Sequence, residues 1–223
     1  MPKNVAHTDT QHQRKVMHMR KLIVVLATIL IIVALGSCTP QKPAPKEPAF
    51  GEIAPAKLTE QEEEITALLA PGLQYSIFDF KIDGSVKSAQ INRYRLENGQ
   101  WTSIGSSGHT LDDTGGRVAL ISDSVAGQNR IVLQNGGDSV AMVYDAPEGA
   151  SSEGMSNAVS YLSGEKSLMY GQEVPLQVQI FTRQSSFSAY DVDVAFSQPE
   201  LYVQQGYEQV YTTTITFSQD TLS

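Results

Sequence analysis

The sequence predicts an all-β fold, an antiparallel β-sandwich of about ten strands preceded by one short amphipathic helix. Three observations support this prediction. Most of the chain after residue 72 consists of short segments in which apolar and polar residues alternate, the period of a half-buried strand. The dipeptide Asn98-Gly99, typical of a two-residue hairpin turn, joins two of these segments. One helix-capping signal begins at Thr59.

Charge divides the 223-residue chain into a basic start and an acidic remainder. The first 37 residues contain five of the 16 basic residues and one of the 24 acidic ones, so the other 186 carry a net charge of −12. A nucleic-acid binder needs a clustered Lys and Arg surface against the phosphates, so we expect no nucleic-acid partner. The length suits one domain with a hydrophobic core.

A secretory signal peptide is predicted for the first 37 residues. Arg20 and Lys21 precede the apolar run Leu22–Leu35. At about 1.5 Å per residue this run spans about 21 Å as a helix, less than the roughly 30 Å hydrocarbon core of a bilayer. A basic region, a short apolar region and small residues are the layout of a signal peptide; an uncleaved anchor helix is the alternative. The long polar start predicts that translation begins at Met17 or Met19.

The residues that follow, Leu35-Gly36-Ser37-Cys38, resemble the lipobox of bacterial lipoproteins, an aliphatic residue and two small residues before a cysteine. The resemblance covers residues 20–38. It implies cleavage before Cys38, a diacylglycerol with fatty acyl chains such as palmitate on its thiol, and a protein held at the extracytoplasmic face of the cell membrane. Two acyl chains give stable attachment. Cys38 is the only cysteine, so the exported domain has no disulfide.

Residues 38–57 are predicted to form a linker between this anchor and a folded domain, residues 58–223. Five of the ten prolines lie in the linker. Proline fixes φ and lacks an N–H donor, so the segment is expected to be extended and solvated.

The predicted helix starts after Thr59, the N-cap, and Glu62 completes a capping box three residues later. Acidic residues in its first turn favour the positive end of the helix dipole. Apolar residues then recur at helical spacing on one face: Ile65, Leu68 and Leu69. Pro71-Gly72 ends the helix.

Strands are predicted over most of the remaining chain. In order, they cover residues 75–82, 91–96, 101–104, 118–121, 131–133, 140–144, 166–170, 174–180, 189–196 and 210–217. A second hairpin turn is expected at Asn135–Asp138, and a loop rich in Gly, Ser and Glu at Asp145–Asn157.

Few residues are candidates for catalysis. His109 is the one histidine of the mature chain, which excludes cysteine–histidine catalysis, cysteine zinc sites and multi-histidine metal sites. Ser106 and Ser107 precede His109, and aspartates follow, so a Ser-His-Asp hydrolase is an alternative function. The sequence contains no G-x-S-x-G elbow, and a polar loop is the preferred interpretation of this segment.

Asp191 and Asp193 lie on the same side of the predicted strand 189–196, because side chains alternate with a period of two. Paired carboxylates can ligate Ca²⁺, which takes six to eight oxygen ligands. We interpret the pair as a solvated strand face and predict neither a metal nor another cofactor.

Three aromatic residues stand in polar surroundings outside the predicted strands: Phe187, Tyr202 and Tyr207. Exposed rings are typical of binding surfaces, so these three are the candidate partner-binding residues. The competing interpretation is that they cap the open end of the sandwich. The preferred function is a non-enzymatic, membrane-anchored lipoprotein that binds a protein or a glycan. The alternatives are the hydrolase and a solute receptor of a transporter.

Overall fold

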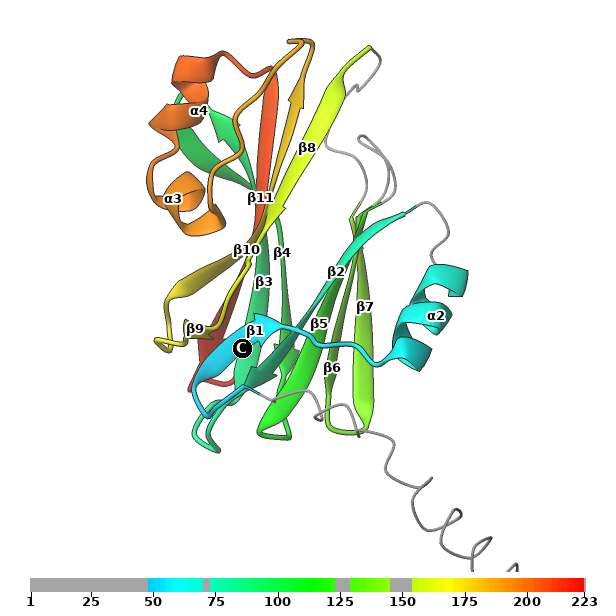
Figure 1. Ribbon diagram of the computed structural model, residues 1–223. Helices are drawn as coiled ribbons and strands as arrows, with labels where there is room; N and C mark the ends of the chain where they lie inside the picture. The colour runs from blue at the N-terminus through cyan, green and yellow to red at the C-terminus, as the bar shows by residue number, and fades with distance from the viewer. Residues whose placement is uncertain (1–47, 70–72, 123–128, 145–153, 223) are drawn as a thin grey trace, which may run out of the picture. The chain divides into compact units, whose positions relative to one another are not determined.

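The computed structural model describes residues 48–69, 73–122, 129–144 and 154–222, and these form two antiparallel sheets of six and five strands (Figure 1). The predicted all-β sandwich is confirmed. None of the helices in these residues is long and apolar enough to cross a membrane. The signal peptide, Cys38 and most of the predicted linker lie outside the described residues.

The first sheet has the strand order β7-β6-β5-β2-β1-β9. Its strands are β1 (Glu52–Pro55), β2 (Gln74–Lys81), β5 (Gly115–Ser122), β6 (Asn129–Asn135), β7 (Asp138–Tyr144) and β9 (Lys166–Ser167). The second sheet has the order β4-β3-β11-β10-β8. Its strands are β3 (Ser88–Glu97), β4 (Gln100–Thr110), β8 (Ser156–Tyr161), β10 (Glu173–Thr182) and β11 (Gln209–Ser218).

Both predicted hairpins are confirmed. Asn98 and Gly99 join β3 to β4 with φ angles of 51° and 79°, the left-handed conformations that a tight hairpin turn requires. Gly136, with φ 59°, lies in the turn between β6 and β7. These turns set the register of their strands.

The hydrophobic core fills the space between the sheets at the end where β1 lies. Phe78 and Phe80 of β2 are buried there, and the Phe80 ring lies 4.9 Å from that of Phe217 in the second sheet. Gly116 makes this packing possible, because a Cβ atom at that position would lie 2.3 Å from the Phe80 ring.

The linker prediction is wrong for its last part. Residues 52–55 form β1, which pairs with β2 and β9, and Ile53 is fully buried. The prolines misled the prediction, since Pro55 stands at the end of the strand, where a missing N–H is tolerated. The folded domain therefore begins before residue 58.

The predicted strand 189–196 is also wrong, because its second half forms the helix α3 (Val192–Ser197). The Asp191 side chain accepts a hydrogen bond from the Asp193 backbone N–H at 3.0 Å, the contact of a helix N-cap. Val192 and Ala195, three residues apart, are fully buried, whereas Val194 is 38% exposed. Alternating valines fit the start of a helix as well as a strand, and the cap decides between them.

Two other predictions were partly wrong. The predicted strand 166–170 is only the two-residue β9. The last two residues of the predicted loop 145–157 belong to β8, and residues 145–153 lie outside the described part of the chain.

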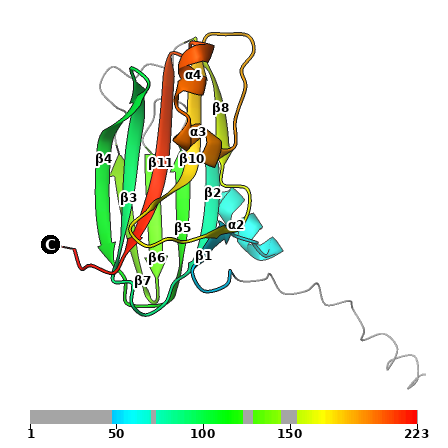
Figure 2. The same cartoon turned by 90° about the vertical axis from the view of Figure 1, so that its left-hand side faces the viewer.

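The helices α3 and α4 (Glu200–Gln205) lie over the outer face of the second sheet (Figure 2). The Trp101 indole of β4 donates a hydrogen bond to the Phe196 carbonyl at 2.9 Å, and the two rings stack at 6.1 Å. The outer face of the second sheet is therefore covered near these helices.

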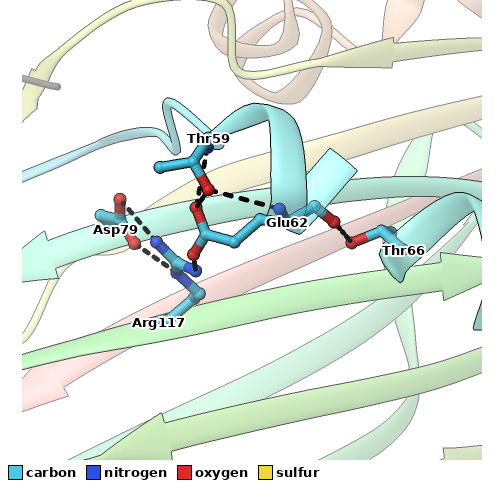
Figure 3. Close-up of polar contacts among 5 residues, drawn as sticks. All are labelled: Thr59, Glu62, Thr66, Asp79 and Arg117. Atoms are coloured by element: carbon cyan, nitrogen blue, oxygen red, sulfur yellow. Dashed lines mark hydrogen bonds and ion pairs between the residues drawn. The ribbon is translucent and has the colours of Figure 1, made fainter. Parts of the chain in front are cut away.

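The predicted helix is α2 (Glu60–Leu69), and its capping box is confirmed. The Glu62 carboxylate accepts hydrogen bonds from the backbone N–H and hydroxyl of Thr59, and its other oxygen lies 3.0 Å from Arg117 of β5 (Figure 3). Arg117 also pairs with Asp79 of β2 at 2.7 Å. The apolar face of α2 is exposed: Ile65 by 48%, Leu68 by 79% and Leu69 by 76%.

Candidate binding site

The inner face of the second sheet changes from apolar to polar along its strands. The apolar part includes the cross-strand partners Ile91 and Ile215. Directly opposed residues of an antiparallel pair share a face, so the strand register defines the next two rows. The polar residues of these rows, which we call the polar stripe, are Arg93, Thr213, Gln177 and Tyr161, then Arg95, Tyr211 and Gln179.

A β-bulge produces this change of face. Val174 pairs with Ile215, but the register shifts between Pro175 and Gln177, so Gln177 pairs with Thr213. One extra residue exchanges the two faces of a strand. Beyond the bulge, the glutamines of β10 therefore face the first sheet.

The apolar residues Val178 and Ile180 consequently lie on the side of α3. Val178 pairs with Thr212, which pairs with Tyr94, and the Tyr94 ring lies 6.3 Å from that of Phe196 in α3. Both residues are buried, in the part of the hydrophobic core that lies between β10 and α3. Pro175 next to the bulge is the one sequence signal for it, because proline inside a central strand is tolerated mainly at a bulge.

Most side chains of the polar stripe are buried although they are polar, whereas Arg95 and Tyr161 are partly exposed. Arg93 is 5% exposed, Gln177 6%, and Gln179 and Thr213 7% each. Within the described part of the chain the amides of Gln177 and Gln179 make no side-chain hydrogen bond to protein, and they keep some access to solvent, because the Tyr202 hydroxyl is the one fully buried side-chain polar atom there without a partner. The inner faces of a sandwich are ordinarily apolar, so polar side chains at these positions are unusual.

Arg93 lies at one end of the stripe, against the first sheet. Its guanidinium carbon is 5.0 Å from the centre of the Tyr144 ring of β7. Gly105 of β4 leaves room for that ring, because a Cβ atom there would lie 3.1 Å from it. Burial lowers the pKa of Arg93, although an arginine stays protonated in proteins. Burial also raises the pKa of Tyr144 and of Tyr211, so both phenols are neutral near pH 7.

A cavity of about 390 Å³ lies at the other end, between β2 and β8. Residues 73–75 line one side, and residues 157–159 and Tyr161 line the other. The edge is open because β1 pairs only with residues 78–81 of β2, and β8 is the last strand of its sheet. The volume falls within the range of small-molecule sites. Tyr161 belongs to both the stripe and the cavity, so the two are continuous.

The partner-binding candidates occupy different places. Tyr202 lies in α4 and is 1% exposed, with its ring 5.4 Å from Tyr190 and 6.0 Å from Tyr207, so its placement in an exposed loop is wrong. It caps the outer face of the second sheet. Tyr207 is partly buried, and its hydroxyl accepts a hydrogen bond from the Ser188 backbone N–H at 2.6 Å. Phe187 is 43% exposed and remains available for contact.

The hydrolase candidates lie in the strand β4, so the predicted polar loop is wrong. The Ser106 hydroxyl bonds to Gln90 at 2.6 Å and to Asn92 at 2.8 Å. Because side chains alternate along a strand, Ser107 and His109 point to the face opposite Ser106. Ser106 and His109 therefore do not form a nucleophile–base pair.

The paired aspartates are used locally. Asp191 caps α3, and Asp193 forms an ion pair with Lys166 of β9. No group of three or more metal-ligating side chains occurs among the residues that the structure describes.

Comparison with protein-family models, curated proteins and solved structures finds no match, so the chemistry of the site rests on its own residues.

Proposed function

We propose that this protein is a lipid-anchored, extracytoplasmic lipoprotein whose sandwich binds a glycan along the polar stripe without catalysing a reaction. The lipobox-like residues 35–38 support the anchor. The observation that carries the glycan proposal is the pair Gln177 and Gln179, which place amides without a protein partner on the inner face of the second sheet, in rows that lead to an open cavity.

The chemistry of the stripe suits a sugar. A side-chain amide both donates and accepts hydrogen bonds, as sugar hydroxyls do. A tyrosine offers an apolar ring face to the C–H side of a sugar and a hydroxyl to its oxygens. Burial raises the pKa of Tyr161, which keeps this hydroxyl protonated as a donor near pH 7.

The positions of the polar side chains support binding without catalysis. Ser106 and His109 are separated by the sheet, Ser107 on the His109 face is hydrogen-bonded with Tyr144, and Asp191 and Asp193 have structural partners. Hydrolysis of an acyl or glycosyl bond needs a nucleophile and a base, or two carboxylates, that converge on one point. Neither arrangement is present in the polar stripe.

A protein partner is the second candidate. Exposed apolar side chains lie on or near α3 and α4: Phe187 at 43%, Val194 at 38% and Val203 at 52%. Such residues contribute to protein interfaces when they gather in one patch. They lie on the outer side of the second sheet, so a protein partner and a glycan would use different faces.

The test is titration of the full-length chain, purified in detergent, with a panel of oligosaccharides. Replacing both Gln177 and Gln179 with Ala removes two hydrogen-bonding groups, each contributing about 0.5–1.5 kcal/mol, so affinity should fall about tenfold or more. The control is Gln134→Ala, an exposed glutamine on the outer face of the first sheet, which should bind as the parent does. If no oligosaccharide binds, or if the double variant binds equally well, the proposal fails.

A further inference from the structure

The Arg93 guanidinium is a buried charge without a counter-ion among the residues that the structure describes. It is 5% exposed, the face of the Tyr144 ring lies 5.0 Å from its guanidinium carbon, and the Tyr211 phenol lies within electrostatic range. Buried charges in proteins are ordinarily paired, because desolvation of an isolated charge is costly. The stacked ring covers one face of the planar group and leaves the N–H donors at its edge without an ion pair.

The neighbouring carboxylates on the second sheet have other partners. Glu97 lies 3.8 Å from Arg95, at the end of the same strand. Glu173 accepts hydrogen bonds from Asn92, Tyr94 and Thr214, which lie on the opposite face of the sheet from Arg93. The phenols of Tyr144 and Tyr211 are neutral near pH 7 and do not neutralise the guanidinium.

Charge is also distributed unevenly along the stripe. Arg93 and Arg95 are both on β3, whereas the residues on β10 and β8 are two amides and a phenol. Three strand spacings separate β3 from β8, which is roughly 14 Å, longer than one sugar ring. A ligand that spans the stripe therefore has an anionic end at β3 and a neutral end at the cavity.

We infer that the glycan is an acidic oligosaccharide whose sugar carboxylate binds Arg93. This inference rests on the proposed function. The guanidinium fork matches a carboxylate in bidentate geometry, and a charge-assisted pair in a buried site is stronger than a neutral hydrogen bond. The positive end of the stripe also selects an anion despite the acidic body, because the charge of Arg93 is local and poorly screened.

The experiment compares trimers of galacturonate, mannuronate and glucuronate with their methyl esters, titrated against the full-length chain in detergent. Esterification removes the negative charge and keeps the ring and its hydroxyls. At least one acid should bind about 10- to 100-fold more tightly than its ester, the range expected of a hydrogen bond to a charged group. Added salt should weaken the acid more than the ester.

Two variants assign this preference to Arg93. Arg93→Gln should bind the acid and the ester with similar affinity. Arg130→Gln, which removes an exposed arginine from the outer face of the first sheet, should keep the preference of the parent. In Arg93→Met the melting temperature without ligand should stay level or rise, because an unpaired buried charge is removed.

The outcomes separate the two proposals. Equal binding of acids and esters by the parent leaves glycan binding intact and overturns the inference, as does an acid preference that survives in Arg93→Gln. A melting temperature that falls sharply in Arg93→Met assigns Arg93 to the core and also overturns it. Failure of every acid, every ester and a neutral panel of maltotriose, cellotriose and chitotriose removes the proposed function itself.

Discussion

The position of a residue in the fold determines how well the domain tolerates a substitution there. Tyr202 and Phe187 look alike in the sequence, since both are aromatic residues outside the predicted strands. The fold separates them, because α4 turns Tyr202 onto the sheet and leaves Phe187 in solvent. Burial, which depends on distant residues, therefore sets the role of each ring.

Tyr202→Ser should destabilise the domain by about 3 kcal/mol or more, because a large side chain is removed from a packed aromatic cluster. Phe187→Ser is the matched control and should change stability by about 0.5 kcal/mol or less, as exposed substitutions do. Urea unfolding of both variants measures the difference. Equal stabilities would show that Tyr202 does not act as a cap.

Gly116→Ala should destabilise the domain by about 1–3 kcal/mol, because the new Cβ atom would overlap both the Phe80 ring and the Gln134 carbonyl, each at 2.3 Å. Gly84→Ala adds the same atom where no other atom lies within 4 Å, and it should be neutral. Thermal unfolding of the two variants provides the comparison. A Gly116→Ala protein as stable as the parent would mean that β5 moves away from Phe80 at little cost.

At the scale of elements, the capping and turn signals predicted the structure correctly. Alternation alone, and features that depend on pairing with a distant strand, did not. The capping box at Thr59 and the turn at Asn98-Gly99 each involve residues at most three positions apart, so the sequence predicts them directly. The prediction of a strand at 189–196 is wrong because the helix cap at Asp191 outweighs the alternation of apolar and polar residues. The short length of β9 depends on its pairing with β1, which lies more than 100 residues earlier.

The attachment of α2 should depend on pH through Glu62. The Thr59 backbone N–H, followed by the Arg117 side chain, lowers the pKa of Glu62 from 4.5 to about 2. A depressed pKa in the folded state means that the stabilisation is present above pH 4.5 and is lost as the pH falls towards 2. Glu62→Gln should therefore be less stable than the parent at pH 7, and the difference should vanish near pH 2.

Thermal unfolding of both proteins between pH 2 and pH 7 measures this effect. Glu64→Gln, which changes an exposed glutamate of the same helix, is the control and should show no such convergence. A constant difference between Glu62→Gln and the parent across this range would contradict the role of the carboxylate. The expected size is small, since the pair is partly exposed to solvent.

At the scale of the molecule, the fold class followed from the sequence, whereas the candidate site did not. The number and type of strands depend on local alternation, which the sequence displays. The polar stripe depends on a register shift in β10 and on cross-strand neighbours from β3, β8 and β11. Gln177 and Gln179 therefore resemble the solvated side of an ordinary strand until the pairing is known.

The proposed anchor predicts the location of the whole protein in a bacterial cell. Cys38→Ala should release the protein from the membrane fraction or leave its precursor uncleaved, since the lipobox cysteine carries the lipid and marks the cleavage point. Fractionation and the mass of the product measure both effects. Cys38→Ala protein that remains in the membrane fraction and is processed normally would contradict the lipoprotein proposal.

The bulge in β10 has a consequence for how such a site can arise or disappear. A substitution changes one side chain, but the insertion or deletion of one codon between Pro175 and Gln177 exchanges the faces of all the β10 residues beyond the bulge. Deletion would place Val178 and Ile180 between the sheets and turn the glutamines towards α3. A shift of one residue along β10 can thus create or remove the proposed binding face, while the amino-acid composition of the chain stays almost the same.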